Sequence, residues 1–290
     1  MKLGLIGLGR MGRAMAQRLT STGAELVVWN RTEEKALDLS ATIADSPAGL
    51  LHDVPIVVLS LLDSRAVEQV LLGEGGLLTG DCEGKILVDT TTNSVEAAER
   101  FGKLVAARGA FYLEAPVMGS VGPAAEGTLK IVVSGPRDAF DEAKDVLDLL
   151  GDRIFYLGAP TLAARMKLVN NLVLGALVAA LCEALAVGTR AGLPREQVMA
   201  ILEEAAGRSA VLAAKKGTLL AQDYAPRFSA ASMHKDLHYL EQLAFAVGVP
   251  VPTAAAVKEL YGLAVANGLG EEDLTVVGRL LGEVPVVRGR

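Results

Sequence analysis

The chain has 290 residues, of which 51% are hydrophobic and 21% are charged, and its formal net charge is -6. The length predicts about two domains of roughly 100–200 residues each. The apolar content excludes a disordered chain, which has too few hydrophobic residues to build a core. The acidic balance argues against a general nucleic-acid binder, because such proteins usually carry a basic excess.

Cysteine and histidine are rare. The two cysteines, Cys82 and Cys182, cannot form a disulfide framework, so we expect a reducing compartment, the cytoplasm. His234 and His238 stand four residues apart, but no His-Glu-x-x-His pattern surrounds them, so we expect no metal site. The first residues have no long apolar run and no cleavage site, so we expect no signal peptide. The low use of Asn and Gln, five of each, is typical of thermophilic proteins.

The first half of the chain alternates short apolar runs with helical patterns. The runs are rich in Val, Ile and Leu and lack strict polar alternation, as buried parallel strands do. This alternation predicts an α/β fold of the Rossmann type, with a doubly wound parallel sheet. The predicted strands are Leu3–Gly7, Glu25–Trp29, Pro55–Leu61, Lys85–Asp89, Phe111–Glu114, Leu129–Ser134 and Ile154–Leu157, and the predicted helices include Arg13–Ser21, Glu33–Ala44 and Ser94–Arg108.

The second half has only helical patterns. We therefore place a domain boundary near residue 160, with a dinucleotide-binding domain over residues 1–160 and an all-α domain over residues 161–290 that opens with a long interdomain helix. Glycines follow several of these helices, as expected of C-terminal stops: Gly192, Gly207, Gly248 and Gly268. The predicted helices are Thr161–Ala191, Pro194–Ala206, Ala210–Gln222, Ser229–Val247, Thr253–Asn267 and Glu271–Leu281.

The segment Leu172–Val187 is apolar on nearly all sides of its predicted helix. It holds 16 residues with Glu183 among them, whereas a membrane span needs about 20 apolar residues. A helix that is apolar all round is otherwise buried. We therefore expect no membrane contact, and burial between two domains or two subunits, with a homodimer or homotetramer as the natural assembly.

A glycine-rich loop follows the first predicted strand and opens the first helix. It reads Gly7, Leu8, Gly9, Arg10, Met11, Gly12 and fits the G-x-G-x-x-G pattern. The first glycine permits the tight turn, the second lets the backbone approach a pyrophosphate, and the third lets helix and strand pack closely. The free N–H groups of the helix N-terminus favour phosphate binding. The loop predicts a dinucleotide site.

The end of the second strand indicates which dinucleotide is bound. An NAD site usually has an Asp or Glu there for the ribose hydroxyls. This chain has Asn30, Arg31 and Thr32 instead. Arg31 can bind a 2′-phosphate, and its neighbours can add neutral hydrogen bonds. The pattern predicts NADP as the cofactor.

Four separated motifs together resemble the β-hydroxyacid dehydrogenase family over essentially the whole chain. They are residues Gly7–Gly12, Glu114–Ser120 with the following Gly127-Thr128, Lys167–Asn171, and Lys235-Asp236-Leu237. The family includes 3-hydroxyisobutyrate dehydrogenases, tartronate semialdehyde reductases and glyoxylate/succinic semialdehyde reductases.

The resemblance implies that Lys167 is the catalytic acid/base. Lys167 and Asn171 stand at i and i+4, so they share one face of the predicted helix. Partial desolvation and a cationic nicotinamide nearby would both favour the neutral amine. A neutral amine can accept the hydroxyl proton as hydride leaves the same carbon. Asn171 would hold the amine and the substrate oxygen in line.

The resemblance also implies a site for a small carboxylate-bearing substrate. Gly119 and Ser120 would supply donors to the carboxylate, and Thr92 would lie near the nicotinamide. The family often has Ser where this chain has Met118. This departure makes the pocket locally more apolar and leaves the substrate assignment open.

Three further residues are implied in cofactor binding. Leu62 and Asp63 follow the third predicted strand and would line the cofactor, and Lys235 would close over it from the second domain.

The expected function is that of an NADP-dependent dehydrogenase. It would transfer hydride between the cofactor and C3 of a small 3-hydroxy acid, such as 3-hydroxyisobutyrate or L-serine. One alternative is an NADPH-dependent glyoxylate or succinic semialdehyde reductase, whose branch the Asn30–Thr32 pattern resembles. Another is a cofactor-binding interaction module that has lost catalysis, against which the intact Lys167–Asn171 stretch argues.

Overall fold

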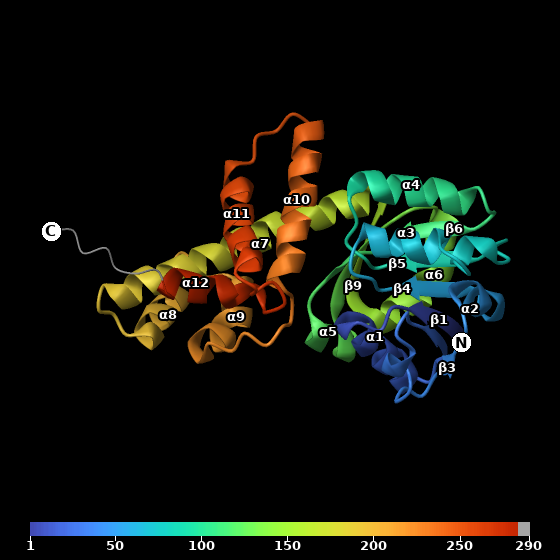
Figure 1. The fold of residues 1–290 in the computed structure, drawn as a ribbon, viewed down its shortest axis with the longest axis horizontal. Helices are drawn as coiled ribbons and strands as arrows, with labels where there is room; N and C mark the ends of the chain where they lie inside the picture. The colour runs from blue at the N-terminus through green and yellow to red at the C-terminus, as the bar shows by residue number, and fades with distance from the viewer. Residues whose placement is uncertain (284–290) are drawn as a thin grey trace. The chain divides into compact units, whose positions relative to one another are not determined.

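The computed structural model describes residues 1–283 and divides the chain into two compact units (Figure 1). The first unit is Met1–Lys167 and the second is Leu168–Arg290. The division falls inside one long helix, α7 (Leu162–Arg190). The first unit is α/β and the second is helical, as the sequence predicts.

The sheet of the first unit has the strand order β3-β2-β1-β4-β5-β6-β8-β7, and β9 pairs with β8. The strands from β3 to β6 are parallel, whereas β8 runs antiparallel to β6 and β7. The predicted parallel Rossmann-type sheet is therefore confirmed over six strands, and β8 departs from it because the chain returns from β7 through a short helix and lies antiparallel to β6 and β7. The strands are β1 (Lys2–Ile6), β2 (Glu25–Trp29), β3 (Thr42–Ile43), β4 (Ile56–Leu59), β5 (Ile86–Asp89), β6 (Phe111–Glu114), β7 (Val117–Met118), β8 (Leu129–Ser134) and β9 (Gly151–Gly158).

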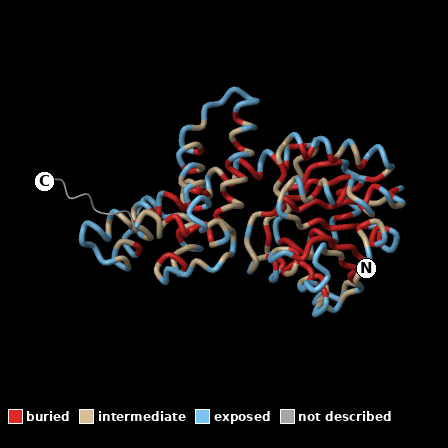
Figure 2. Tube along the Cα trace, in the orientation of Figure 1, coloured by how far each residue is buried: buried red, intermediate tan, exposed pale blue. Residues whose placement is uncertain are grey.

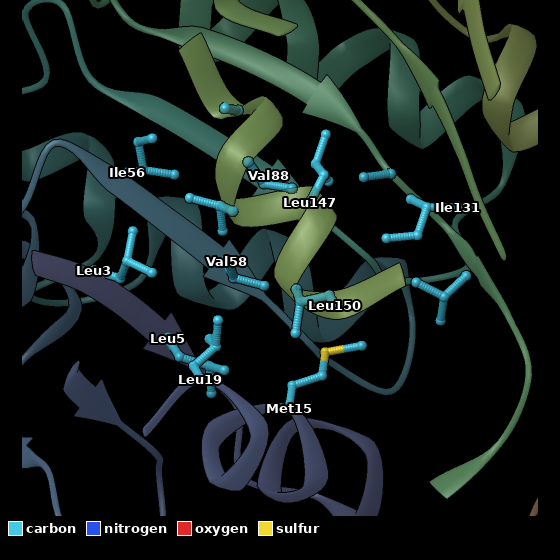
Figure 3. Packing of buried hydrophobic residues seen from close by; sticks show 14 of the residues in the cluster. Leu3, Leu5, Met15, Leu19, Ile56, Val58, Val88, Ile131, Leu147 and Leu150 are labelled. Atoms are coloured by element: carbon cyan, nitrogen blue, oxygen red, sulfur yellow. The ribbon is translucent and has the colours of Figure 1, made fainter. Parts of the chain in front are cut away.

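Helices cover both faces of this sheet, and Figure 2 shows buried residues along its strands. Successive residues of one strand face opposite cores: Val58 packs in the first, with α1 and α6, while Val57 and Leu59 pack in the second, with α2, α3 and α4. Figure 3 shows Met15 and Leu19 beside the sheet in the first core. Burial on both faces explains the unbroken apolar runs. The helices are α1 (Arg10–Ser21), α2 (Pro47–Asp53), α3 (Ser64–Leu72), α4 (Val95–Ala106), α5 (Val121–Glu126) and α6 (Arg137–Leu150).

The helix predicted over Glu33–Ala44 is wrong. The structure has a single 3₁₀ turn, Glu33–Lys35, and then the short strand β3. Of residues 33–38 only Ala36 is buried, so the segment has no apolar stripe with which to dock a helix. Pairing of β3 with β2 uses the end of the segment instead.

The second unit is built from helices around the greater part of α7. Small residues let these helices approach α7 closely: a Cβ at Gly175 would lie 3.0 Å from the Met233 sulfur of α10, and one at Gly278 would lie 3.3 Å from Cys182 Sγ. The helices are α8 (Arg195–Glu204), α9 (Ala210–Ala221), α10 (Ala230–Ala246), α11 (Pro252–Ala266) and α12 (Val277–Glu283).

The helix ends of the second unit agree with the predicted stops in part. Gly192, Gly248 and Gly268 have positive φ after α7, α10 and α11, as C-terminal glycines do. Gly207 is not among the residues with positive φ. The helix predicted over Glu271–Leu281 begins later, after Asp273, whose carboxylate accepts hydrogen bonds at a 3₁₀ turn over Leu274–Val276.

Helix α7 is long and apolar enough to cross a membrane, judged by length and composition alone. Its most apolar 18-residue window has a mean hydropathy of 2.1, and 33% of that window is buried within the chain. Core helices of other proteins pass the same test. Apolar side chains such as Val169, Val173 and Val187 are exposed along it. Contact between subunits at α7 remains a prediction.

Candidate functional site

Five loops that carry predicted site residues follow parallel strands at the same edge of the sheet. They follow β2, β1, β4, β5 and β6, whose carboxyl ends point the same way. The strand order changes direction between β1 and β4, and such a switch point is where doubly wound sheets bind ligands. The topology therefore brings most of the predicted residues of the first unit to one edge.

The glycine loop has the geometry that its sequence predicts. Gly7 has a φ of +98°, and a Cβ there would lie 2.3 Å from the carbonyl oxygen of Ser60. A Cβ on Gly12 would lie 1.9 Å from the Gly7 carbonyl oxygen, so only glycine fits. A Cβ on Gly9 would meet no atom within 4 Å, which leaves open space for a ligand beside the backbone. This space suits a pyrophosphate.

The N-terminus of α1 is free to bind an anion. Its N-cap, Gly9, has no side chain to cap it, and its first turn holds no acidic residue. Arg10 is exposed in that turn. The N–H groups of this helix end and the positive end of its dipole therefore favour phosphate.

The loop after β2 is braced against the glycine loop. Asn30 accepts a hydrogen bond from the Leu8 N–H through Oδ1 at 2.8 Å and donates one from Nδ2 to the Thr32 carbonyl at 2.8 Å. Asn30 is thus engaged within the protein. Arg31 and Thr32 are exposed, and no described residue binds the Arg31 guanidinium. Arg31 is therefore the group available to a 2′-phosphate.

The loop after β4 supplies the two residues predicted to line the cofactor. Leu62 is 69% exposed, so an apolar side chain stands open at this edge. Asp63 is the N-cap of α3, where its carboxylate accepts the Ala66 N–H at 2.8 Å. This cap gives Asp63 a structural role that the sequence reading did not assign.

A buried carboxylate organises the loop after β5. Asp89 accepts hydrogen bonds from the Tyr112 hydroxyl at 2.6 Å, from Asn93 Nδ2 at 2.8 Å and from the Thr91 N–H at 2.9 Å. Burial raises the pKa of Asp89 against the effect of these donors, and it raises the pKa of Tyr112 well above its usual value. The half-buried Thr92 lies in the loop that these contacts hold.

The segment Glu114–Ser120 runs from β6 through β7 to the start of α5. Gly119 has a φ of +129°, which favours glycine, and it is exposed. Ser120 is the N-cap of α5, but its hydroxyl makes no capping hydrogen bond. That hydroxyl is available to a ligand. Met118 is half-buried and pairs with Lys130 in the sheet.

Lys167 reaches this same segment from α7. Its Nζ donates a hydrogen bond to the Val117 carbonyl at 2.8 Å, and the residue is only 8% exposed. A buried amine is thereby placed at the loop that follows β6, three residues before Ser120.

Glu114 holds the start of α7, which the sequence reading missed. Its two carboxylate oxygens accept the N–H groups of Thr161 at 2.5 Å and Ala164 at 3.1 Å, and Ser134 Oγ accepts that of Ala163 at 3.1 Å. Burial raises the pKa of the Glu114 carboxyl, and these N–H donors oppose the rise. Thr161 has a φ of +71°, a conformation that costs a β-branched residue on the order of 1–3 kcal/mol.

The predicted residues of the second unit, the buried Asn171 and the half-buried Lys235, meet at the buried Asp236. Asn171 is fully buried, donates from Nδ2 to Asp236 Oδ2 at 2.6 Å and accepts a hydrogen bond from Asn170. Lys235 Nζ lies 2.9 Å from Asp236 Oδ1 and 5.0 Å from the ring centre of Tyr239. Asp236 therefore links the two predicted residues, Asn171 and Lys235.

Three buried carboxylates were left without a role by the sequence analysis: Glu114, Asp89 and Asp236. Each is less than 5% exposed. Glu114 and Asp89 each end a predicted apolar strand, and this is the signal that could have singled them out. In the part of the chain that the structure describes, no group of three His, Cys, Asp or Glu side chains could hold a metal ion.

Two family models match the chain, one for each half. The model for the NAD binding domain of 6-phosphogluconate dehydrogenase matches residues 2–158. The model described as NAD-binding of NADP-dependent 3-hydroxyisobutyrate dehydrogenase matches residues 162–281. Both halves of the chain therefore match models of nicotinamide-dependent dehydrogenases.

Relatives of known sequence or structure match over nearly the full length. Glyoxylate/succinic semialdehyde reductase 1 of Arabidopsis thaliana is 32% identical over 280 residues, which cover 96% of this chain and 97% of the relative. The crystal structure of 3-hydroxyisobutyrate dehydrogenase from Salmonella typhimurium is 25% identical, with a TM-score of 0.88 over 97% of this chain and 99% of that one. Psf3 in complex with NADP+ and 2-OPP is 28% identical, with a TM-score of 0.88 over 96% of this chain and 99% of that one.

Proposed function

The chain belongs to the β-hydroxyacid dehydrogenase family, and we propose that it transfers hydride between NADP and C3 of a small 3-hydroxy acid, with Lys167 as the general acid/base. The contact of Lys167 with the Val117 carbonyl carries this proposal. It holds a buried amine beside the segment after β6, at the sheet edge that also carries the predicted cofactor loops.

Three features of the first unit would hold NADP. The open space beside Gly9 and the uncapped N-terminus of α1 suit the pyrophosphate. Arg31 has no partner among the described residues and suits the 2′-phosphate, because a guanidinium binds phosphate through paired hydrogen bonds. The bound nicotinamide supplies the acceptor or donor of hydride.

Lys167 handles the proton in this proposal. In oxidation, the neutral amine accepts the proton of the substrate hydroxyl while the C–H bond at the same carbon gives up hydride. In reduction, the ammonium returns a proton to the carbonyl oxygen. Burial of Lys167 keeps competing water from the amine.

The substrate is bound by its carboxylate. Ser120 supplies a hydroxyl that makes no capping hydrogen bond, and Gly119 keeps the adjoining backbone exposed. Thr92, on the loop held by Asp89, supplies a further hydroxyl near the nicotinamide. Met118 in the same segment favours a small substrate with an apolar substituent, such as 3-hydroxyisobutyrate, over L-serine.

Reduction of a semialdehyde is the second candidate. The 32% identity to glyoxylate/succinic semialdehyde reductase 1, over nearly all of both chains, favours it, as does the Asn30–Thr32 sequence. The same residues would serve both directions, because a general acid in one direction is a general base in the other.

A substrate panel tests the proposal. The purified protein is assayed with 3-hydroxyisobutyrate, L-serine and 1-propanol in the presence of NAD or NADP. Glyoxylate and succinic semialdehyde are assayed with NADH or NADPH. We expect the acids to exceed 1-propanol by more than about tenfold in kcat/KM, since a charge-assisted hydrogen bond contributes roughly 1.5–3 kcal/mol. Equal rates with 1-propanol would overturn the carboxylate site, and no turnover of any compound would indicate a binding module without catalysis.

A further inference from the structure

The N-terminus of α7 is capped by two side chains of the sheet. Glu114 at the end of β6 accepts the N–H groups of Thr161 and Ala164, and Ser134 at the end of β8 accepts that of Ala163. The first helical hydrogen bond runs from the Arg165 N–H to the Thr161 carbonyl. The sheet thus fixes both the height and the rotation at which α7 begins.

This cap lies one turn before Lys167. Lys167 is three residues beyond Ala164, so its side chain emerges from the turn that directly follows the capped one. Glu114 also begins the segment that contains Val117, the acceptor of the Lys167 amine. The same carboxylate therefore fixes the helix that carries the donor and the strand end that leads to the acceptor.

The backbone at the cap is held in a rare conformation. Thr161 has a positive φ and is 6% exposed, and its N–H points to Glu114. Such a conformation persists where the surroundings determine it. A helix that only had to be stabilised could begin with a relaxed residue and its own side-chain cap, as α4 does at Ser94.

We infer that Glu114, assisted by Ser134, is a positioning residue that sets the place of the Lys167 amine. This inference rests on the proposed role of Lys167 in proton transfer. Because a misplacement of about 1 Å can cost on the order of 100-fold in rate, Glu114→Gln should lower kcat about 10-fold and Glu114→Ala about 100-fold. Gln retains one acceptor oxygen, so it rescues part of the rate. The glycine loop and Arg31 are untouched, so the Kd of NADP should stay within about twofold.

A double-mutant cycle with Lys167→Met tests the inference. If Glu114 acts through Lys167, adding Glu114→Gln to Lys167→Met should leave kcat unchanged, since no amine remains to be positioned. Ser134→Ala should lower kcat by a smaller factor than Glu114→Gln. In the Lys167→Met background, Ser134→Ala should likewise leave kcat unchanged. The matched control is Ser46→Ala, which removes the side-chain cap of α2 at Gly49 and should leave kcat unchanged.

The outcomes separate this inference from the proposed function. A 10-fold loss from Glu114→Gln that persists in the Lys167→Met background would overturn positioning through Lys167. Wild-type kcat in Glu114→Gln would overturn it as well. A near-normal kcat in Lys167→Met alone would instead overturn the proposed role of Lys167. Should Glu114→Ala fail to fold, Glu114→Gln and Ser134→Ala carry the test.

Discussion

The side-chain oxygen of Asn30 accepts a hydrogen bond from the backbone N–H of Leu8 at 2.8 Å. This contact joins the loop after β2 to the glycine loop after β1, across adjacent strands. The second amide contact of Asn30, to the Thr32 carbonyl, fixes the backbone on both sides of Arg31. The two predicted cofactor loops are therefore held together by Asn30, a residue that the sequence predicted to contact the cofactor.

Replacing Asn30 should weaken both dinucleotides equally. Asn30→Ala leaves the Leu8 N–H without its partner, which costs about 1 kcal/mol, and loosens the loop that would hold the pyrophosphate. We expect the Kd values for NAD and NADP to rise by a similar factor, measured by fluorescence titration. A loss confined to NADP would assign Asn30 to the 2′-phosphate.

Replacing Arg31 should instead affect NADP alone. The guanidinium has no described partner to lose, so Arg31→Ala should not destabilise the fold. Loss of a charge-assisted contact of roughly 1.5–3 kcal/mol should raise the KM for NADP at least about tenfold and leave that for NAD nearly unchanged. Equal losses with both cofactors would show that Arg31 does not read the phosphate.

Two glycines of the loop should respond in opposite ways. A Cβ at Gly9 meets nothing within 4 Å, so Gly9→Ala should keep the thermal midpoint of unfolding and raise the Kd for both dinucleotides at least about tenfold. A Cβ at Gly12 would lie 1.9 Å from a backbone oxygen, so Gly12→Ala should destabilise the first unit by about 1–3 kcal/mol. Normal cofactor affinity in Gly9→Ala would place the pyrophosphate elsewhere.

Elements with a local sequence pattern could be predicted from the sequence alone. Apolar runs predicted β1, β2, β4, β5, β6, β8 and part of β9, and the glycine pattern predicted the turn at Gly7 and the close packing at Gly12. Two-residue strands, β3 and β7, have no periodicity of their own and form only because a neighbouring strand offers a partner. The helix predicted over Glu33–Ala44 is wrong for a different reason, because helix-favouring residues without an apolar stripe have no face to bury.

Polar contacts between residues far apart in the chain could not be predicted from the sequence. Glu114 and Thr161 are 47 residues apart, and Asn171 and Asp236 are 65 apart. No local pattern specifies which backbone N–H a buried carboxylate will accept. The sequence identified candidate cofactor residues after the first three predicted strands, whereas the pairing of the buried polar groups depends on the packed fold.

Burial of Glu114 gives the first unit a defined dependence on pH. The folded carboxyl has a pKa above its usual value of 4.5, so the folded state binds its proton more tightly than the unfolded chain. Its contribution to stability is therefore fully present below pH 4.5 and is lost as the pH rises through the folded pKa. Relative to Glu114→Gln, the wild type should become less stable as the pH rises through that window.

Urea unfolding followed by the fluorescence of Trp29, the single tryptophan of the chain, measures this difference in the first unit. A stability difference between wild type and Glu114→Gln that grows in favour of the wild type with rising pH would contradict the raised pKa.

The most direct test of the proposed function is the kcat of Lys167→Met with the best acid of the substrate panel. Positioned acid–base catalysis contributes about 10²–10⁴-fold, so kcat should fall on that scale. The NADP affinity should persist, because the glycine loop and Arg31 are untouched. A kcat near that of the wild type would contradict proton transfer by Lys167 and leave its bond to the Val117 carbonyl as a structural contact only.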